Sequence, residues 1–97
     1  ELQEKVFLMN VMRNKWILRR EILWYSNRYL GGVYVSESGI IAAAHLSGPG
    51  NVKKYLRSHC DENLNKKDAN GTSISDYLRI FKDYDIEDIP FERKPKL

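Results

Sequence analysis

The stretch Val33–Tyr55, VYVSESGIIAAAHLSGPGNVKKY, decides the fold of this chain. It starts with three β-branched or aromatic residues after a glycine pair, which predicts a short strand. The small and apolar residues that follow predict a helix, because alanine is the best helix former. Such a helix has little side-chain volume, so other segments can approach its backbone closely. We therefore predict a central helix that ends near Leu46, before the Gly-Pro-Gly turn at 48–50.

Two serines can begin this helix, since the side chain of Ser36 or Ser38 can accept hydrogen bonds from free backbone N–H groups. Glu37 then lies in the first turn, where the helix dipole stabilises a negative charge.

The segment before this stretch reads as one long amphipathic helix over residues 3 to about 26, uninterrupted by Pro or Gly. Its apolar residues recur at helical spacings of three and four. They include Val6, Met9, Met12, Trp16 and Leu23. The basic side chains at 13, 15, 19 and 20 are predicted to lie mostly on the solvent side. The aromatic residues near 24–29 mark the end of this helix.

Beyond the turn, a further helix is predicted from about residue 50 to 59, followed by a polar loop over 60–73. Ser73 and Asp76 form a capping box for a last helix that ends near Lys82. The fold is thus predicted to be mainly α: four helices with one short strand or turn excursion near residues 32–36. We expect a helical lobe over 1–84 and an extended basic tail over 85–97.

Composition limits the function classes. The chain has 97 residues, enough for one domain at most, and a net charge of +3 from 16 basic and 13 acidic residues. This mild excess predicts a solvated surface more than nucleic-acid binding. No apolar run approaches the roughly 20 residues of a membrane span. The first residue is Glu, so we expect a piece of a longer protein. The lone Cys60 and the two histidines lack metal-ligand spacing, and we expect neither a metal nor a cofactor.

Three stretches carry a resemblance to a known family: Gln3-Glu4, Gly32 to Gly50, and Asp68 to Tyr77 with its DANGTS sequence. Together they resemble the C-terminal half of the lysozyme-like domain of phage-derived and bacterial cell-wall proteins, and they span most of residues 3–84. The resemblance implies a mostly helical lysozyme-like fold that acts on peptidoglycan glycan strands. It also implies a periplasmic, extracellular or virion-associated location.

The same resemblance places the catalytic acid outside this chain, on a helix upstream of the Gln-Glu pair. This chain would then supply the helical lobe and one wall of the glycan cleft, and it would be inactive alone. Glycosidases usually use two carboxylates, whereas a lytic transglycosylase can work with one. Within the chain, Glu37 is the carboxylate beside the recognisable motif, so it is the internal candidate for the acid.

Four residues are predicted to contact sugar, because aromatic faces and small polar groups commonly hold glycans. They are Tyr34, Ser38, Asn70 and Tyr77. Each has a structural alternative: the tyrosines can be core residues, Ser38 a helix cap and Asn70 a turn residue.

Two other functions stay open from the sequence. One is a non-enzymatic module that binds cell wall or another protein, and the other is a nucleic-acid-binding helical domain. If half of the fold lies elsewhere, the apolar face of the first helix is a further candidate surface for a homodimer.

Overall fold

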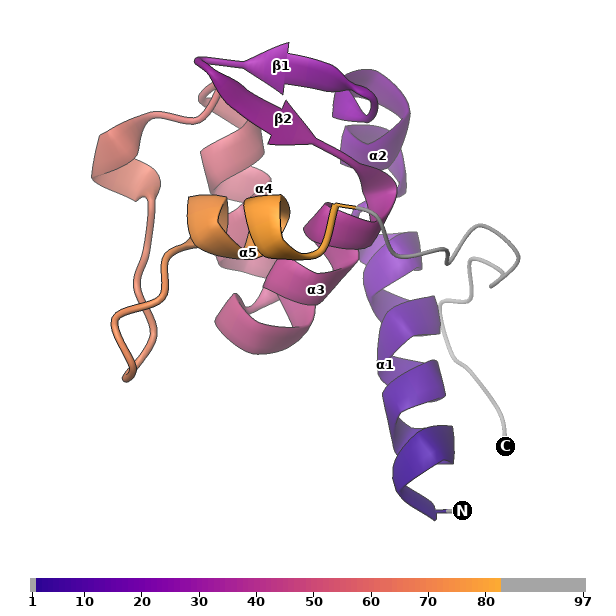
Figure 1. The fold of residues 1–97 in the computed structure, drawn as a ribbon. Helices are drawn as coiled ribbons and strands as arrows, with labels where there is room; N and C mark the ends of the chain where they lie inside the picture. Colours follow the sequence, from indigo (N-terminus) through magenta and orange to yellow (C-terminus); the bar gives the residue numbers. More distant parts are fainter. Residues whose placement is uncertain (1, 83–97) are drawn as a thin grey trace.

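The computed structural model describes the backbone of residues 2–82 and the side chains of residues 9–82 (Figure 1). The elements follow in the order α1 Leu2–Ile17, α2 Arg19–Tyr25, β1 Arg28–Leu30, β2 Val33–Val35, α3 Glu37–Ser47, α4 Pro49–Arg57, the 3₁₀ helix η1 Glu62–Leu64 and α5 Ile74–Ile80. The described part is mainly helical with one small sheet, as predicted. The predicted basic tail lies outside the described residues.

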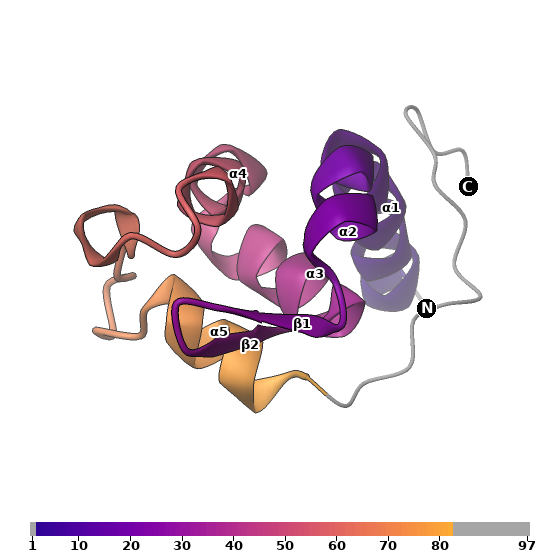
Figure 2. The same ribbon diagram turned by 90° about the horizontal axis from the view of Figure 1, so that it is seen from above.

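Helix α3 occupies the centre, with α1, α4 and α5 packed around it (Figure 2). It buries six residues, from Ser38 to Ala44 with Ala42 excepted, and Ala43 and Ala44 are at most 2% exposed. At Gly39, a Cβ would lie 2.9 Å from the carbonyl oxygen of Leu78, so a larger residue would collide with the backbone of α5. The central, closely packed helix predicted from the alanine run is confirmed.

The long N-terminal helix is broken, contrary to the prediction of one helix over 3–26. Leu18 has φ −102° and ψ 15° and separates α1 from α2, although its amide still donates to the Asn14 carbonyl at 2.9 Å. The sequence has no Pro or Gly near this break. Leu18 is fully buried, and α2 turns toward α4 after it.

The predicted polarity of this segment is also wrong in two places. Lys15, expected in solvent, is 1% exposed, and Leu23, expected in the apolar stripe, is 79% exposed. Lys15 is buried because it pairs with Glu37 of α3. Leu23 lies on α2, beyond the irregular residue Leu18, and does not continue the apolar face of α1.

The predicted short strand, β2, pairs with a second strand, β1, in an antiparallel hairpin. Strand β1 lies where the sequence predicted the end of the first helix and a turn. Tyr29 lies directly opposite Tyr34 in the register, and Leu30 opposite Val33. The two-residue turn at Gly31-Gly32 has φ of 55° and 85°, a conformation that glycine adopts without strain and that matches the twist of a hairpin. Side chains alternate between the two faces of a strand, and Val35 is buried in the core.

The predicted helix caps are largely confirmed. The hydroxyl oxygen of Ser36, one of the two serines considered, accepts from the Gly39 amide at 3.0 Å. The capping box is present at α5, where Ser73 accepts from the Asp76 amide and Asp76 accepts from the Ser73 amide. These hydrogen bonds set the positions at which α3 and α5 begin.

Candidate functional site

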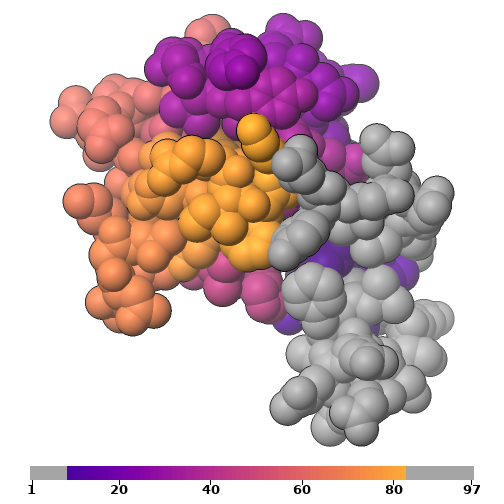
Figure 3. Space-filling view, viewed as in Figure 1, coloured from indigo at the N-terminus to yellow at the C-terminus, as the bar shows by residue number. Residues whose placement is uncertain are grey.

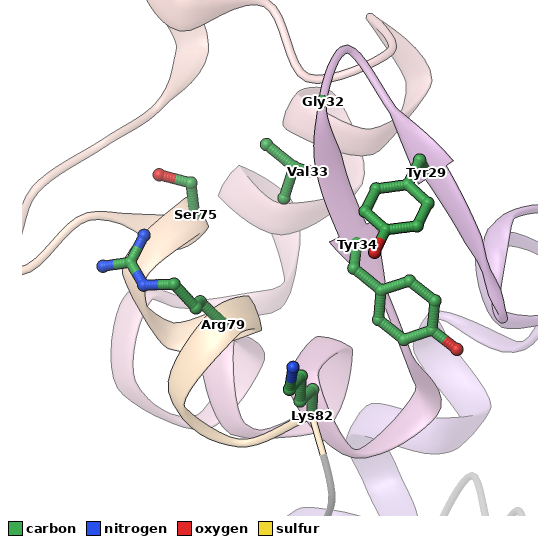
Figure 4. A pocket seen from close by; sticks show the side chains of 7 residues that line it. All are labelled: Tyr29, Gly32, Val33, Tyr34, Ser75, Arg79 and Lys82. Atoms are coloured by element: carbon green, nitrogen blue, oxygen red, sulfur yellow. The ribbon is translucent and has the colours of Figure 1, made fainter.

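A groove of about 280 Å³ opens between the hairpin and α5. The two elements meet on one face of the molecule, with the hairpin above α5 (Figure 3). The groove is lined by Tyr29, Gly32, Val33, Tyr34, Ser75, Arg79 and Lys82. Figure 4 shows the two tyrosines on the hairpin side and Ser75 and Arg79 on α5 across from them, with the polar ends of Ser75 and Arg79 directed away from the rings in this view.

The hairpin wall is aromatic. The rings of Tyr29 and Tyr34 pack edge to face, with centroids 5.1 Å apart and planes at 65°. Tyr29 is 71% exposed, so most of its ring is open to a ligand. Exposed aromatic rings with hydroxyl groups at their tips offer both a flat apolar face and a polar edge to a ligand.

The helical wall is polar and basic. Ser75 and Arg79 are four residues apart and share one face of α5, and Lys82 follows in the turn after the helix ends at Ile80. The hydroxyl of Ser75 is held by the Asn65 amide at 2.9 Å. Arg79 contacts Asp76 at 2.7 Å. The pKa of Asp76 is lowered, first by the hydrogen bond from the Ser73 amide and then by Arg79.

Of the four predicted sugar-contacting residues, Tyr34 lines this groove and the other three lie elsewhere. Ser38 is buried and donates to the Phe81 carbonyl at 2.6 Å, which ties α3 to the end of α5. Asn70 is exposed in the loop before α5, where its amide donates to Asp68. Tyr77 is buried and donates from its hydroxyl to Asp68.

The contact between Asp68 and Tyr77 holds the loop to α5. It lowers the pKa of Asp68 and raises the pKa of Tyr77, because the hydrogen bond favours the charged carboxylate and the neutral phenol. The backbone amides of Asn70 and Thr72 also donate to the same carboxylate. The DANGTS motif thus builds a turn that sets the start of α5.

Glu37, the internal candidate for a catalytic acid, is not among the residues that line the groove. It lies in the first turn of α3, 22% exposed, and its carboxylate is 3.0 Å from the ammonium nitrogen of Lys15. This ion pair joins α1 to α3. Its geometry assigns Glu37 a structural contact between helices.

A second ion pair joins α2 to α4. Arg57 donates from Nε to Glu21 at 2.7 Å, and the Glu21 side chain is 1% exposed. Among the residues that the structure describes, no donor lies within hydrogen-bond reach of the other carboxylate oxygen of Glu21. The guanidinium of Arg57 also lies 5.3 Å from the centre of the Trp24 ring.

Of the seven groove residues, only Tyr34 was predicted as a site residue. The other six are Gly32, Val33, Tyr29, Ser75, Arg79 and Lys82. The last three carried a signal, since their spacing places them on one face of the predicted last helix. Tyr29 could be identified only if the strand at 28–30 had been predicted. The two-residue turn then places Tyr29 opposite Tyr34.

Within the described part of the chain, no group of three or more His, Cys, Asp or Glu side chains is arranged to hold a metal ion. No helix there has the length and apolar character to cross a membrane. Comparison with known proteins adds no relative: no family model matches the chain, and neither a curated protein nor a solved structure matches it.

Proposed function

We propose that this chain is the C-terminal helical lobe of a peptidoglycan-cleaving, lysozyme-like domain, and that it holds a glycan strand in the groove between the hairpin and α5. The observation that carries the proposal is the pair of packed tyrosines, Tyr29 and Tyr34, which line one side of an open groove whose other side is lined by Ser75, Arg79 and Lys82. Sugar rings present apolar C–H faces and hydroxyl edges, and these match an aromatic wall and a polar wall.

The stretches that carry the family resemblance supply four lining residues of this groove, Gly32, Val33, Tyr34 and Ser75, and they also build its walls. Gly32 belongs to the hairpin turn, and Gly39 allows the backbone of α5 to approach α3. Asp68 and Tyr77 fix the start of α5. Residues outside these stretches, Tyr29, Arg79 and Lys82, complete the lining.

We expect the catalytic acid to come from a segment upstream of this chain. Purified cell walls should therefore keep their turbidity when they are incubated with the 97-residue chain or with its Glu37→Gln variant. Clearing by the parent chain and not by the variant would make Glu37 the acid and would contradict the expectation of an external one.

Glycan binding is tested directly by titrating soluble peptidoglycan fragments into the labelled chain and following backbone amide NMR signals. Tyr29→Ala and Tyr34→Ala should each weaken binding about threefold to tenfold, since an aromatic contact contributes about 0.5–1.5 kcal/mol. Trp24→Ala is the matched control, because Trp24 is a partly exposed aromatic residue on α2 that does not line the groove. Unperturbed signals from the hairpin and α5 would contradict the proposal.

The same groove suits a non-enzymatic module that binds the cell wall, so glycan binding alone does not separate the two functions. The upstream part of the parent reading frame separates them. A Glu-bearing helix there supports the enzyme, whereas a start codon or signal peptide directly before residue 1 supports the module.

A further inference from the structure

We infer that the C-terminal segment 83–92 of this chain packs along α1 and covers a second apolar face of that helix, the Met-Trp stripe formed by Met9, Met12 and Trp16. This contact within the chain is separate from the proposed glycan site and does not depend on it. It follows from the two apolar faces of α1, from the opposite charges of the segment and the helix, and from the point at which the chain leaves α5.

Helix α1 lies at one edge of the described fold and has apolar side chains on two faces (Figure 1). Val11 and Leu18 are at most 1% exposed and mark the face that packs on the core. Met9, Met12 and Trp16 recur at spacings of three and four, so they form a second face, rotated from the first by roughly a third of a turn. Among the side chains of residues 9–82, these three are neither in the core nor packed against it. A helix with two apolar faces is expected to be covered on both.

The Met-Trp stripe is bordered by arginines. The guanidinium carbon of Arg19 lies 3.9 Å from the centre of the Trp16 ring, and its Nη1 donates to the Trp16 carbonyl at 2.8 Å. Arg13 is exposed and lies on the other side of the stripe in the helical arrangement. A segment that fits this surface therefore needs apolar side chains together with carboxylates.

The sequence of residues 83–92, DYDIEDIPFE, has both. It carries five carboxylates and no basic side chain, and the basic residues of the tail begin only at Arg93. The chain before it, residues 1–82, has 13 basic and 8 acidic side chains and thus a net charge of +5. The acidic residues of the segment alternate with large apolar ones, namely Tyr84, Ile86, Ile89 and Phe91.

The segment also starts beside α1. The carbonyl oxygen of Phe81 accepts from Ser38 at 2.6 Å, which holds the end of α5 at the first turn of α3. In the same turn, Glu37 lies 3.0 Å from the ammonium nitrogen of Lys15, the neighbour of Trp16 on α1. Ten extended residues span at most about 33 Å, and the 16 residues of α1 span about 24 Å. The segment can therefore cover the whole stripe by running from Trp16 toward the N-terminus of α1.

The chain's own segment is favoured over a second copy of the chain. Its covalent link makes the contact intramolecular, at an effective concentration on the order of millimolar. A two-fold dimer through the Met-Trp stripe would instead place the same surface against itself and bring the arginines of both copies together.

Paramagnetic broadening of NMR signals tests the contact in the full-length chain. A nitroxide is attached to Glu92→Cys in a Cys60→Ser background, which keeps a hydroxyl beside Tyr55 in place of the thiol. We expect the label to broaden backbone amide signals of α1, most strongly in its N-terminal half, and to leave those of α4 sharp. Mixing labelled chain with isotope-enriched, unlabelled chain separates contacts between copies from contacts within one chain.

The fluorescence of Trp16 gives a second measurement that needs no label. Trp24→Phe leaves Trp16 as the only tryptophan. In that background, Ile86→Ser with Ile89→Ser should increase the quenching of Trp16 by acrylamide at least about twofold and shift its emission to longer wavelength, because the ring loses its apolar cover.

Lys94→Ser with Lys96→Ser is the matched control, since both residues belong to the tail but lie beyond the segment. This variant should leave the quenching of Trp16 unchanged.

Three results would overturn the inference. Broadening that appears only in the mixture would make a second copy the occupant of the stripe. Broadening confined to elements other than α1, or no broadening, would place the segment elsewhere. Equal quenching of Trp16 with and without Ile86→Ser and Ile89→Ser would show that the segment does not cover the ring. None of these results bears on glycan binding in the groove.

Discussion

The two sides of α3 are held by different kinds of contact. On the N-terminal side, α1 and α2 are joined to α3 and α4 by ion pairs in which one partner is buried: Lys15 with Glu37, and Glu21 with Arg57. On the other side, α5 is joined to α3 by the close backbone approach at Gly39 and by the hydrogen bond from Ser38.

The two sides should therefore respond to different substitutions: one to the loss of a charge, the other to added side-chain volume. A buried charge that loses its partner is costly, whereas a pair of well-packed apolar residues in the same place is often no less stable. A backbone contact depends on volume instead and tolerates no added methyl group. The groove is built on the second side, so its shape should respond to small changes of volume and little to changes of charge among the first helices.

The largest effect is expected on the charged side. Arg57→Met should lower the free energy of unfolding by about 3–5 kcal/mol, because it leaves the carboxylate of Glu21 buried without a cation. The double variant Glu21→Leu with Arg57→Met should recover most of this loss. Urea denaturation of the parent, the single variants and the double variant measures both values.

Lys54→Met serves as the control for a charge removed from the exposed face of the same helix, and it should change stability little. A loss below about 1 kcal/mol for Arg57→Met would show that Glu21 does not depend on its partner, contrary to the expected cost of a stranded charge. The contrast between the two sides of α3 would then be smaller than described.

A smaller effect is expected on the close-packed side. Gly39→Ala should destabilise the protein by about 1–3 kcal/mol, since the new methyl group meets the α5 backbone and outweighs the gain in helix propensity. Gly50→Ala is the matched control, because Gly50 lies in α4 with open space around it. That variant should be neutral or slightly stabilising. Thermal unfolding distinguishes the two, and equal effects would contradict a close contact at Gly39.

The smallest effect concerns pH. The folded-state pKa of Asp68 lies below its unfolded value of about 3.9, so its contribution to stability is present above that pH and is lost as the pH falls through the folded pKa. Asp68→Asn should therefore lower the melting temperature at pH 7, and the difference from the parent should shrink toward pH 3. A difference that stays constant over this range would mean that the carboxylate charge contributes nothing.

Local patterns predicted the parts of the fold that depend on neighbouring residues. The alanine run, Ser36 and the Ser73–Asp76 box each act within one or two turns of helix, and the helices they predict are present. The break at Leu18 could not be predicted, because it depends on the packing of α2 against α4 and has no local signal. The burial of Lys15 likewise follows from a partner on another helix.

The candidate site was predicted less completely for the same reason. Tyr34 was named from its residue type, and it does line the groove. Ser38 and Tyr77 were named on the same grounds, but their hydroxyls bind within the protein, to Phe81 and Asp68. Their role in sugar contact stays a prediction, as does that of Asn70. Which hydroxyls face solvent depends on how α5 lies against α3.

The groove exists only when the chain is folded. Its two walls come from segments far apart in the sequence, β1 and β2 on one side and α5 on the other. A ligand that touches both walls binds the native chain and not the unfolded one, so its binding free energy adds to that of folding. At a concentration tenfold above its dissociation constant it would add about 1.4 kcal/mol. Candidate ligands of the groove can therefore be screened by the rise in the melting temperature of the chain that they cause.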